Sequence, residues 1–186
     1  MMQLDDSFGV VLFVTVALAV AAVIDGWKLK VPNWLTFPFV LSGLAYHLIT
    51  GGWSGLGASL LGCVLGLGLL LAPYVIGGMG AGDVKLFAGV GAWMGPQVTF
   101  GAFCVSAVVG GVLAVALVAL RSLRDQGLAA RSWERFQMVF GEIMTIKNPG
   151  HLAELAAARK PTATLLPYGI PLAIGTVAHF FWLGLL

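Results

Sequence analysis

The fold is decided by 35 consecutive residues without a formal charge, Leu86 to Leu120, which read LFAGVGAWMGPQVTFGAFCVSAVVGGVLAVALVAL. They suffice for one overlong membrane helix or two short ones, and Gly95-Pro96-Gln97 forms a turn signal near the middle. A turn there places all ten Lys and Arg residues on one side of a membrane, whereas a single helix puts seven of the ten on the opposite side. Because basic loops favour the cytoplasm, the stretch predicts two membrane spans.

The composition excludes a water-soluble globule. Of 186 residues, 59% are hydrophobic and 10% are charged, whereas about 25% are charged in soluble domains. The net charge of +2 is too small and too dispersed for a nucleic-acid-binding surface. The two cysteines, Cys63 and Cys104, lie far apart and provide neither a disulfide framework nor a paired zinc site. Asp5 and Asp6 stand where a signal peptide has basic residues, so we expect the first hydrophobic segment to be retained.

The hydrophobic segments predict an all-α fold, a polytopic membrane bundle of about six helices. The expected spans cover residues 7–24, 34–50, 56–76 and 83–95, then a span from the Gly-Pro-Gln turn to residue 120, and residues 165–186. The fourth has only 13 residues, which is about 20 Å of helix. We expect one integral-membrane domain, residues 1–186, with both termini outside and the basic loops in the cytoplasm.

Two further features concern the surface and the packing of this bundle. Residues 121–161 combine aromatic side chains at helical spacing with Arg and Glu, which predicts an amphipathic helix on the cytoplasmic surface. A substrate-docking arm is the alternative interpretation of that loop. Small residues around Gly62, Gly66, Gly110 and Gly111 predict faces where helices pack closely.

Two acidic residues stand at the ends of predicted spans. Asp25 ends the first span and Asp83 opens the fourth, so counting the crossings brings both to the cytoplasmic border. Each has a structural explanation, since Asp25 can pair with Lys28 or Lys30 and Asp83 can cap a helix. Ionisable groups in a membrane bundle are costly, however, and two at one border indicate a functional site.

Two carboxyl groups that share a proton can act as base and acid toward a water molecule, which is the chemistry of aspartic peptidases. Asp83 lies at the positive N-terminal end of its helix and Asp25 at the negative C-terminal end. The sequence therefore predicts that Asp83 is the base and Asp25 is the acid.

Three motifs give this chain a resemblance to a known family. Residues 25–36, DGWKLKVPNWLT, resemble the first catalytic segment of the type IV prepilin peptidases, the GxGD membrane aspartic peptidases. Residues 80–85, GAGDVK, resemble their GxGDxK motif, and residues 167–175, PYGIPLAIG, resemble the pattern that opens their last span. The motifs occur in the family's order and cover nearly all of the membrane part.

The resemblance implies a membrane-embedded aspartic endopeptidase of the prokaryotic inner membrane, with Asp25 and Asp83 as catalytic residues. It implies removal of a short basic leader from prepilin-like proteins on the cytoplasmic side of their hydrophobic segment, without a cofactor. The size is similar to the short forms that serve tight-adherence (Flp) pili, and archaeal preflagellin peptidases share the motifs. The paired cysteines of longer, N-methylating members have no counterpart here, so methyl transfer is not expected.

The motif neighbours have physical roles as well. Gly80 and Gly82 allow positive φ and a close backbone approach, which suits an extended substrate strand. Pro32 stops helical continuation and Asn33 can cap the next helix. Lys85 is expected to hold the loop rather than to take part in the chemistry.

Two other interpretations compete with the peptidase. A small ion-coupled transporter requires acids near the bilayer midplane and paired half-repeats, and a non-catalytic membrane subunit of a pilus or secretion assembly requires no chemistry. No Ser-His or Cys-His constellation and no metal-ligand cluster competes with the aspartates, and His47 and His179 are expected to pack or form hydrogen bonds elsewhere. The expected partners are a prepilin-like protein and the lipid bilayer, not nucleic acid.

Overall fold

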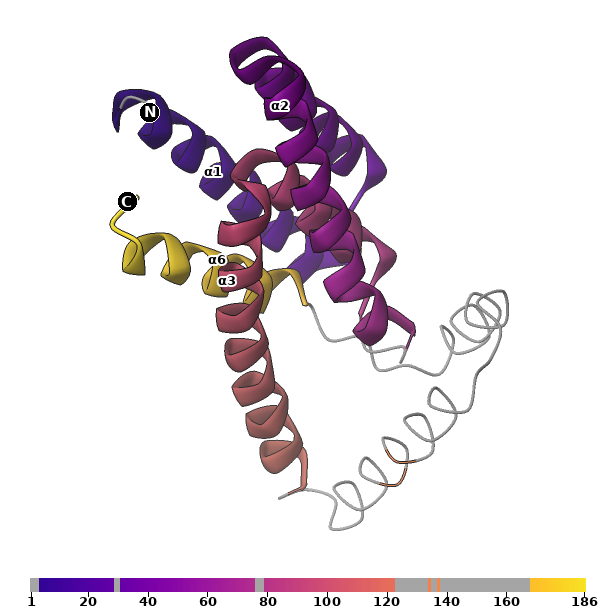
Figure 1. Ribbon diagram of the computed structural model, residues 1–186. Helices are drawn as coiled ribbons and strands as arrows, with labels where there is room; N and C mark the ends of the chain where they lie inside the picture. Colours follow the sequence, from indigo (N-terminus) through magenta and orange to yellow (C-terminus); the bar gives the residue numbers. More distant parts are fainter. Residues whose placement is uncertain (1–3, 29–30, 76–78, 123–133, 135–136, 138–167) are drawn as a thin grey trace.

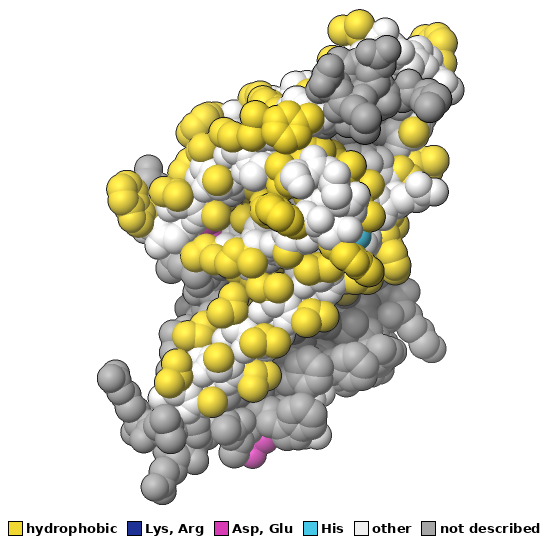
Figure 2. Space-filling view, turned by 90° about the vertical axis from the view of Figure 1, so that its left-hand side faces the viewer, with side chains coloured by type: hydrophobic (Ala, Val, Ile, Leu, Met, Phe, Trp, Pro, Cys, Tyr) yellow, Lys and Arg dark blue, Asp and Glu magenta, His cyan; other side chains and the backbone are white. Residues whose placement is uncertain are grey.

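A computed structural model describes residues 4–28, 31–75, 79–122, 134, 137 and 168–186 of the chain. Regular structure in these ranges is helical: α1 (Leu4–Lys28), α2 (Asn33–Val75), α3 (Ala81–Ser122) and α6 (Gly169–Trp182) (Figure 1). By length and composition α1, α2 and α3 can cross a membrane, and α6 is a shorter apolar helix. Hydrophobic side chains cover most of the described surface in Figure 2. The predicted all-helical membrane fold is thereby confirmed.

Both long helices contain a break at a glycine. Gly52 in α2 has φ 59° and ψ −148°, and Gly95 in α3 has φ 74° and ψ 174°. Such positive φ angles strain any residue with a Cβ. The rings of Phe87 and Phe103, on either side of the second break, lie 6.5 Å apart, so the two halves of α3 run back along each other. The turn predicted at Gly95 is thus confirmed, while the number of membrane crossings stays a prediction.

The first half of α3, residues 81–94, is the centre of the bundle. From residue 83 to residue 93 every side chain except one is buried. The ring of Phe39, from the first half of α2, lies against Gly89, and Gly62, from the second half of α2, lies against Gly91. Helices rather than lipid therefore surround this segment, which explains how a stretch too short to span the bilayer alone is accommodated.

Glycines allow the second half of α2 to contact this central segment through its backbone. A Cβ at Gly66 would lie 2.6 Å from the carbonyl oxygen of Phe87, and a Cβ at Gly62 would overlap the backbone of Gly91. The predicted packing faces are confirmed at both positions. At Gly111 the prediction is wrong, because a Cβ there would meet nothing within 4 Å.

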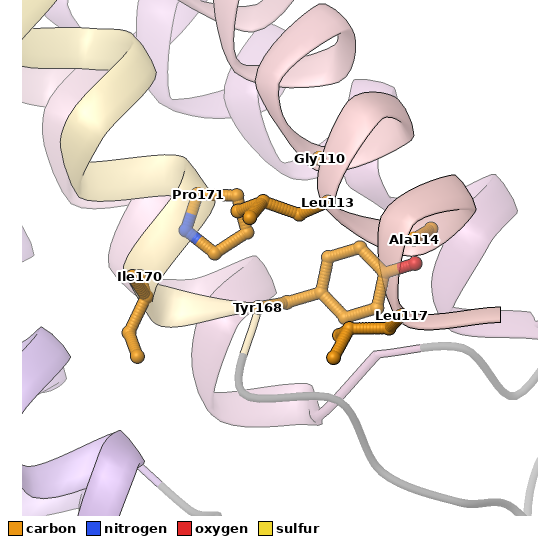
Figure 3. A pocket seen from close by; sticks show the side chains of 7 residues that line it. All are labelled: Gly110, Leu113, Ala114, Leu117, Tyr168, Ile170 and Pro171. Atoms are coloured by element: carbon orange, nitrogen blue, oxygen red, sulfur yellow. The ribbon is translucent and has the colours of Figure 1, made fainter. Parts of the chain in front are cut away.

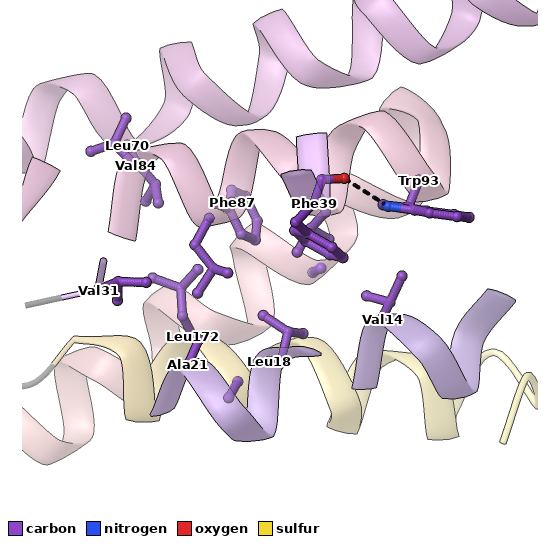
Figure 4. Close-up of a cluster of buried hydrophobic side chains, with 14 of the residues drawn as sticks. Val14, Leu18, Ala21, Val31, Phe39, Leu70, Val84, Phe87, Trp93 and Leu172 are labelled. Carbon is purple, nitrogen blue, oxygen red and sulfur yellow. Dashed lines mark hydrogen bonds between the residues drawn. The ribbon is translucent and has the colours of Figure 1, made fainter. Parts of the chain in front are cut away.

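The central segment ends with its carbonyl groups bonded. Ser59 Oγ donates to the carbonyl oxygen of Ala92 at 2.6 Å, and His47 Nε2 donates to that of Trp93 at 2.9 Å. Trp93 Nε1 in turn donates to the carbonyl oxygen of Phe39 at 2.9 Å (Figure 4). In hydrocarbon an unpaired carbonyl at a helix end is costly. These side chains therefore stabilise the reversal at Gly95, and the hydrogen-bonding role predicted for His47 is confirmed.

Helix α1 presents one buried stripe to the bundle. Its members recur at spacings of three and four residues, so they lie on one face of the helix: Val11, Val14, Leu18, Ala21 and Asp25. Figure 4 shows the apolar part of this stripe facing side chains of α2, α3 and α6. The last member of the stripe is a carboxylate, which the helix therefore directs into the protein.

The bundle has two distinct ends. At one end a cavity of about 320 Å³ is lined by residues that include Val10, His47, Gly95 and Leu185. The start of α1, the turn of α3 and the residues after α6 therefore lie together, and the two chain ends lie on one side of the bundle (Figure 1). The aspartates occupy the opposite end.

We predict that Gly62→Ala lowers the free energy of unfolding by about 1–3 kcal/mol, because the new methyl group overlaps the backbone of Gly91. The matched control is Gly57→Ala on the same half of α2, where a Cβ would meet nothing within 4 Å. The control should be neutral or stabilising by up to about 1 kcal/mol. Unfolding in mixed detergent micelles measures both, and equal stabilities would contradict the packing described here.

Candidate active site

The structure brings together the two carboxyl groups that the sequence singled out. Asp25 lies in the last turn of α1 and Asp83 in the first turn of α3. Each side chain is only 3% exposed. The two lie near enough for the charge on Asp25 to act on Asp83. Residues 58 positions apart in the sequence thus form one buried acidic pair.

Asp25 is held by the start of α6. The backbone N–H of Gly169 donates to Asp25 Oδ2 at 2.9 Å. N–H groups in the first turn of a helix lack intrahelical partners, and they favour a negative charge. A Cβ at Gly169 would lie 2.9 Å from the same oxygen. The third motif therefore contributes a glycine that lets the α6 backbone reach the carboxylate.

Asp83 is held by the turn that precedes it. The N–H of Gly80 donates to Asp83 Oδ2 at 3.2 Å, and the N–H of Asp83 donates to the carbonyl oxygen of Gly80 at 3.2 Å. This reciprocal pair resembles a helix capping box, so the capping role considered for Asp83 is present. The hydrogen bond from Gly80 uses only one oxygen of the Asp83 carboxylate, Oδ2. The other, Oδ1, is buried and has no hydrogen-bond partner in the described part of the chain.

Gly82 provides a close contact between the first two motifs. A Cβ at Gly82 would lie 2.6 Å from the carbonyl oxygen of Val31, which is itself buried. The expected close approach is therefore present, but it is made to the chain's own segment after α1. The expected positive φ at Gly80 and Gly82 is wrong, since the positive-φ glycines of the described ranges lie elsewhere. Closeness of backbones, rather than a left-handed turn, accounts for a glycine at position 82.

Lys85 provides a second contact between the motif of residues 25–36 and the motif of residues 80–85. Its Nζ donates to Asn33 Oδ1 at 3.0 Å and lies 4.9 Å from the centre of the Phe37 ring. The carbonyl oxygen of Pro32, rather than the Asn33 side chain, bonds the first turn of α2, accepting from the N–H of Leu35 at 3.1 Å. The side chain of Asn33 thus serves as the acceptor for Lys85, and the capping role expected for it is not observed.

The geometry suits acid and base catalysis on a water molecule. Each carboxylate has one oxygen fixed by a backbone N–H, and two positioned carboxyl groups are what acid and base catalysis on a water requires. Among the described residues no three His, Cys, Asp or Glu side chains gather into a candidate metal site.

Sequence reasoning found the two aspartates but missed the groups that hold them. Neither the contact from Gly169 nor that from Val31 follows from periodicity, because both depend on which helix lies alongside. The glycine-rich third motif was the available signal for Gly169. Of the predicted loop helix within 121–161, the structure describes only residues 121–122, which end α3, and residues 134 and 137. The rest of that prediction and the side chains of Lys28 and Lys30 lie outside the described part of the chain.

Curated relatives share part of their length with this chain. The "Prepilin leader peptidase/N-methyltransferase" of Aeromonas salmonicida is 35% identical over 118 residues, which are 60% of this chain and 40% of that protein. Proteins of the same name are 35% identical over 113 residues in Neisseria gonorrhoeae and 34% identical over 122 residues in Pseudomonas aeruginosa. The aligned part covers 57% and 61% of this chain and 39% and 41% of those two relatives. No solved structure gives a significant match.

The sequence profile of the type IV leader peptidase family matches residues 12–115. That range contains both carboxylates and the contacts that tie the first motif to the second. The match covers more than half of the chain, which therefore belongs to the type IV leader peptidase family.

Proposed function

We propose that this chain is an aspartic endopeptidase that removes the short basic leader of prepilin-like proteins, with Asp25 and Asp83 as its catalytic residues. The observation that carries the proposal is the buried pair itself, two carboxyls from separate motifs, each held by a backbone N–H. Family membership supports the peptidase class, and the curated relatives are named as prepilin leader peptidases.

In the proposed reaction the water oxygen bonds to the scissile carbonyl carbon while one carboxylate takes a proton from the water. The other carboxyl donates its proton to the carbonyl oxygen. Collapse of the tetrahedral intermediate breaks the C–N bond, and the leaving nitrogen receives the proton taken from the water. One hydroxyl of the intermediate returns its proton to the carboxylate that had donated one, which restores the pair and leaves the carboxylic acid product. Asp83 Oδ1, buried and without a partner among the described residues, suits contact with the water.

The expected division into an Asp83 base and an Asp25 acid needs revision. It rested on the opposite helix ends that α1 and α3 present to the pair. The start of α6 also meets Asp25, and this positive helix end favours its ionised form. The helix ends that face Asp25 and Asp83 therefore differ less in charge than expected, so we assign the proton to the two carboxyls together rather than to one of them.

The proposed location is the prokaryotic inner membrane, with the aspartate end of the bundle toward the cytoplasm and both termini outside. Lys28, the last residue of α1, and Lys85 belong to helix ends on that side of the bundle, as the positive-inside tendency requires. Exposed tryptophans support the two borders, because such rings anchor at membrane interfaces. Trp27 and Trp34 belong to the aspartate end, and Trp53 and Trp182 belong to the opposite end.

In this proposed function, residues 1–186 form one peptidase domain, similar to the short peptidases that serve tight-adherence (Flp) pili. A protein substrate and the bilayer are its partners, and hydrolysis needs no cofactor. The chain spans about 40% of the length of the curated relatives, whose name includes methyl transfer. The proposed activity therefore covers leader cleavage alone.

We predict that Asp25→Asn and Asp83→Asn each lower the rate of leader release by at least about 100-fold, because an amide neither takes up nor donates the required proton. The assay uses the purified full chain in detergent with a membrane-spanning prepilin. Glu134→Gln, the same kind of change at an exposed position, is the control and should retain activity. Full cleavage by either aspartate variant would rule out the pair as the catalytic centre, and absence of leader release by the unaltered protein would favour the transporter or the non-catalytic subunit.

We also predict that Lys85→Ala and Asn33→Ala each lower kcat by about tenfold, the equivalent of roughly 1.4 kcal/mol. Both remove the hydrogen bond that ties the first motif to the second. Because they break one contact, the double variant should lose little more than either single variant. Additive losses, or a lowered unfolding temperature that accounts for the effect, would contradict this positioning role.

A further inference from the structure

A partly open groove runs between the second half of α2, the second half of α3 and the start of α6. Its volume is about 340 Å³. Its lining includes Leu70, Met79, Phe87, Phe103, Gly111 and Tyr168. A smaller hollow of about 190 Å³, shown in Figure 3, shares part of the same wall, including Gly110, Tyr168 and Pro171.

The chemistry of this groove selects an apolar occupant. Carbon dominates its walls, and hydroxyl groups come from Ser106 and Tyr168 alone among the lining residues. The hydroxyl of Ser106 donates to the carbonyl oxygen of Leu172 at 3.3 Å, so it is used within the protein. A volume of 340 Å³ is about twice the ~150 Å³ in which a benzene ring fits. The space therefore suits two large apolar side chains.

Along the groove, one face of α3 carries small residues that no other described helix fills. A Cβ added at Gly110 would lie 3.7 Å from the Cβ of Pro171, which is an ordinary contact distance. Gly111 faces open space. This differs from Gly62 and Gly66, whose missing side chains are replaced by the backbone of α3.

The walls of the groove are continuous with the aspartate site. Met79 directly precedes the glycine whose N–H binds Asp83, and Tyr168 directly precedes the glycine whose N–H binds Asp25. Phe87 lies one helical turn after Asp83 on the same helix. A chain positioned at the carboxylates and continuing into the membrane therefore meets this groove next.

We propose that the groove receives the apolar side chains that follow the scissile bond of a membrane-spanning protein substrate. This proposal rests on the proposed peptidase function and assigns specificity to the face of α3 around Gly111. Because the groove leads directly to the two carboxylates, it suits an apolar peptide segment that continues from the scissile bond. A lipid chain would gain nothing from the acidic pair at its end.

The test compares Gly111→Leu with Gly68→Leu in the full chain, reconstituted with purified substrate. Both changes add the same side chain where a Cβ would meet nothing within 4 Å, but Gly68 lies outside the groove. Two substrates are used, a membrane-spanning prepilin and a peptide that carries only glycine and alanine after the scissile bond, so that it has no large apolar side chain for the groove. We expect Gly111→Leu to lower kcat/KM for the membrane-spanning substrate at least tenfold more than for the peptide, and Gly68→Leu to change neither.

Equal losses on both substrates, or no loss with Gly111→Leu, would overturn the groove proposal while leaving the peptidase intact. Failure of the unaltered chain to cleave either substrate would instead remove the proposed function. A second readout uses Asp83→Asn as a trap and a photoreactive residue just after the scissile bond. Cross-links to the second half of α3 support the proposal, whereas cross-links confined to α1, lipid or a second copy of this chain contradict it.

Discussion

Backbone contact between α2 and α3 is the constraint on which the rest of the structure depends. The first half of α3 is too short to cross a bilayer alone, and it is held in the centre because Gly62 and Gly66 let a neighbouring helix touch its backbone. With this segment fixed, Asp83 occupies a set depth, and α1 and α6 can close around it. The position of the acidic pair is thus a result of helix packing some distance from it.

The two ends of the central segment differ in how their polar groups are satisfied. At the end near Gly95, Ser59 and His47 donate to the carbonyl groups that the helix leaves open. At the other end, Asp83 keeps one buried oxygen without a partner among the described residues. Leaving such a group unpaired is destabilising. The two ends therefore differ: one has paired carbonyl groups, and the other keeps a buried carboxylate oxygen available.

The sequence was sufficient for the all-helical membrane fold and for the reversal within α3, and it singled out the two aspartates that the structure buries. Placement of the basic residues predicted the reversal at Gly95, because membrane orientation is a property of the whole chain and is visible in its charges. The spacing of apolar residues did not predict that Gly169 reaches Asp25, or that Val31 lies on Gly82. Those contacts depend on which helix faces pack against each other. The spacing of apolar residues shows which face of a helix is buried, but not which segment covers it.

The second half of α3 continues well past the level of the acidic pair. Gly110 lies beside Pro171 near the start of α6, yet the helix extends to Ser122, roughly 18 Å further. Val115 and Leu120 on this extension are 70% and 62% exposed, as expected of side chains that face lipid. The carboxylates consequently lie well short of the level that the end of α3 reaches. In the proposed peptidase, a scissile bond that arrives within a helix is shielded by the helix's own hydrogen bonds, so the local chain has to unwind before hydrolysis.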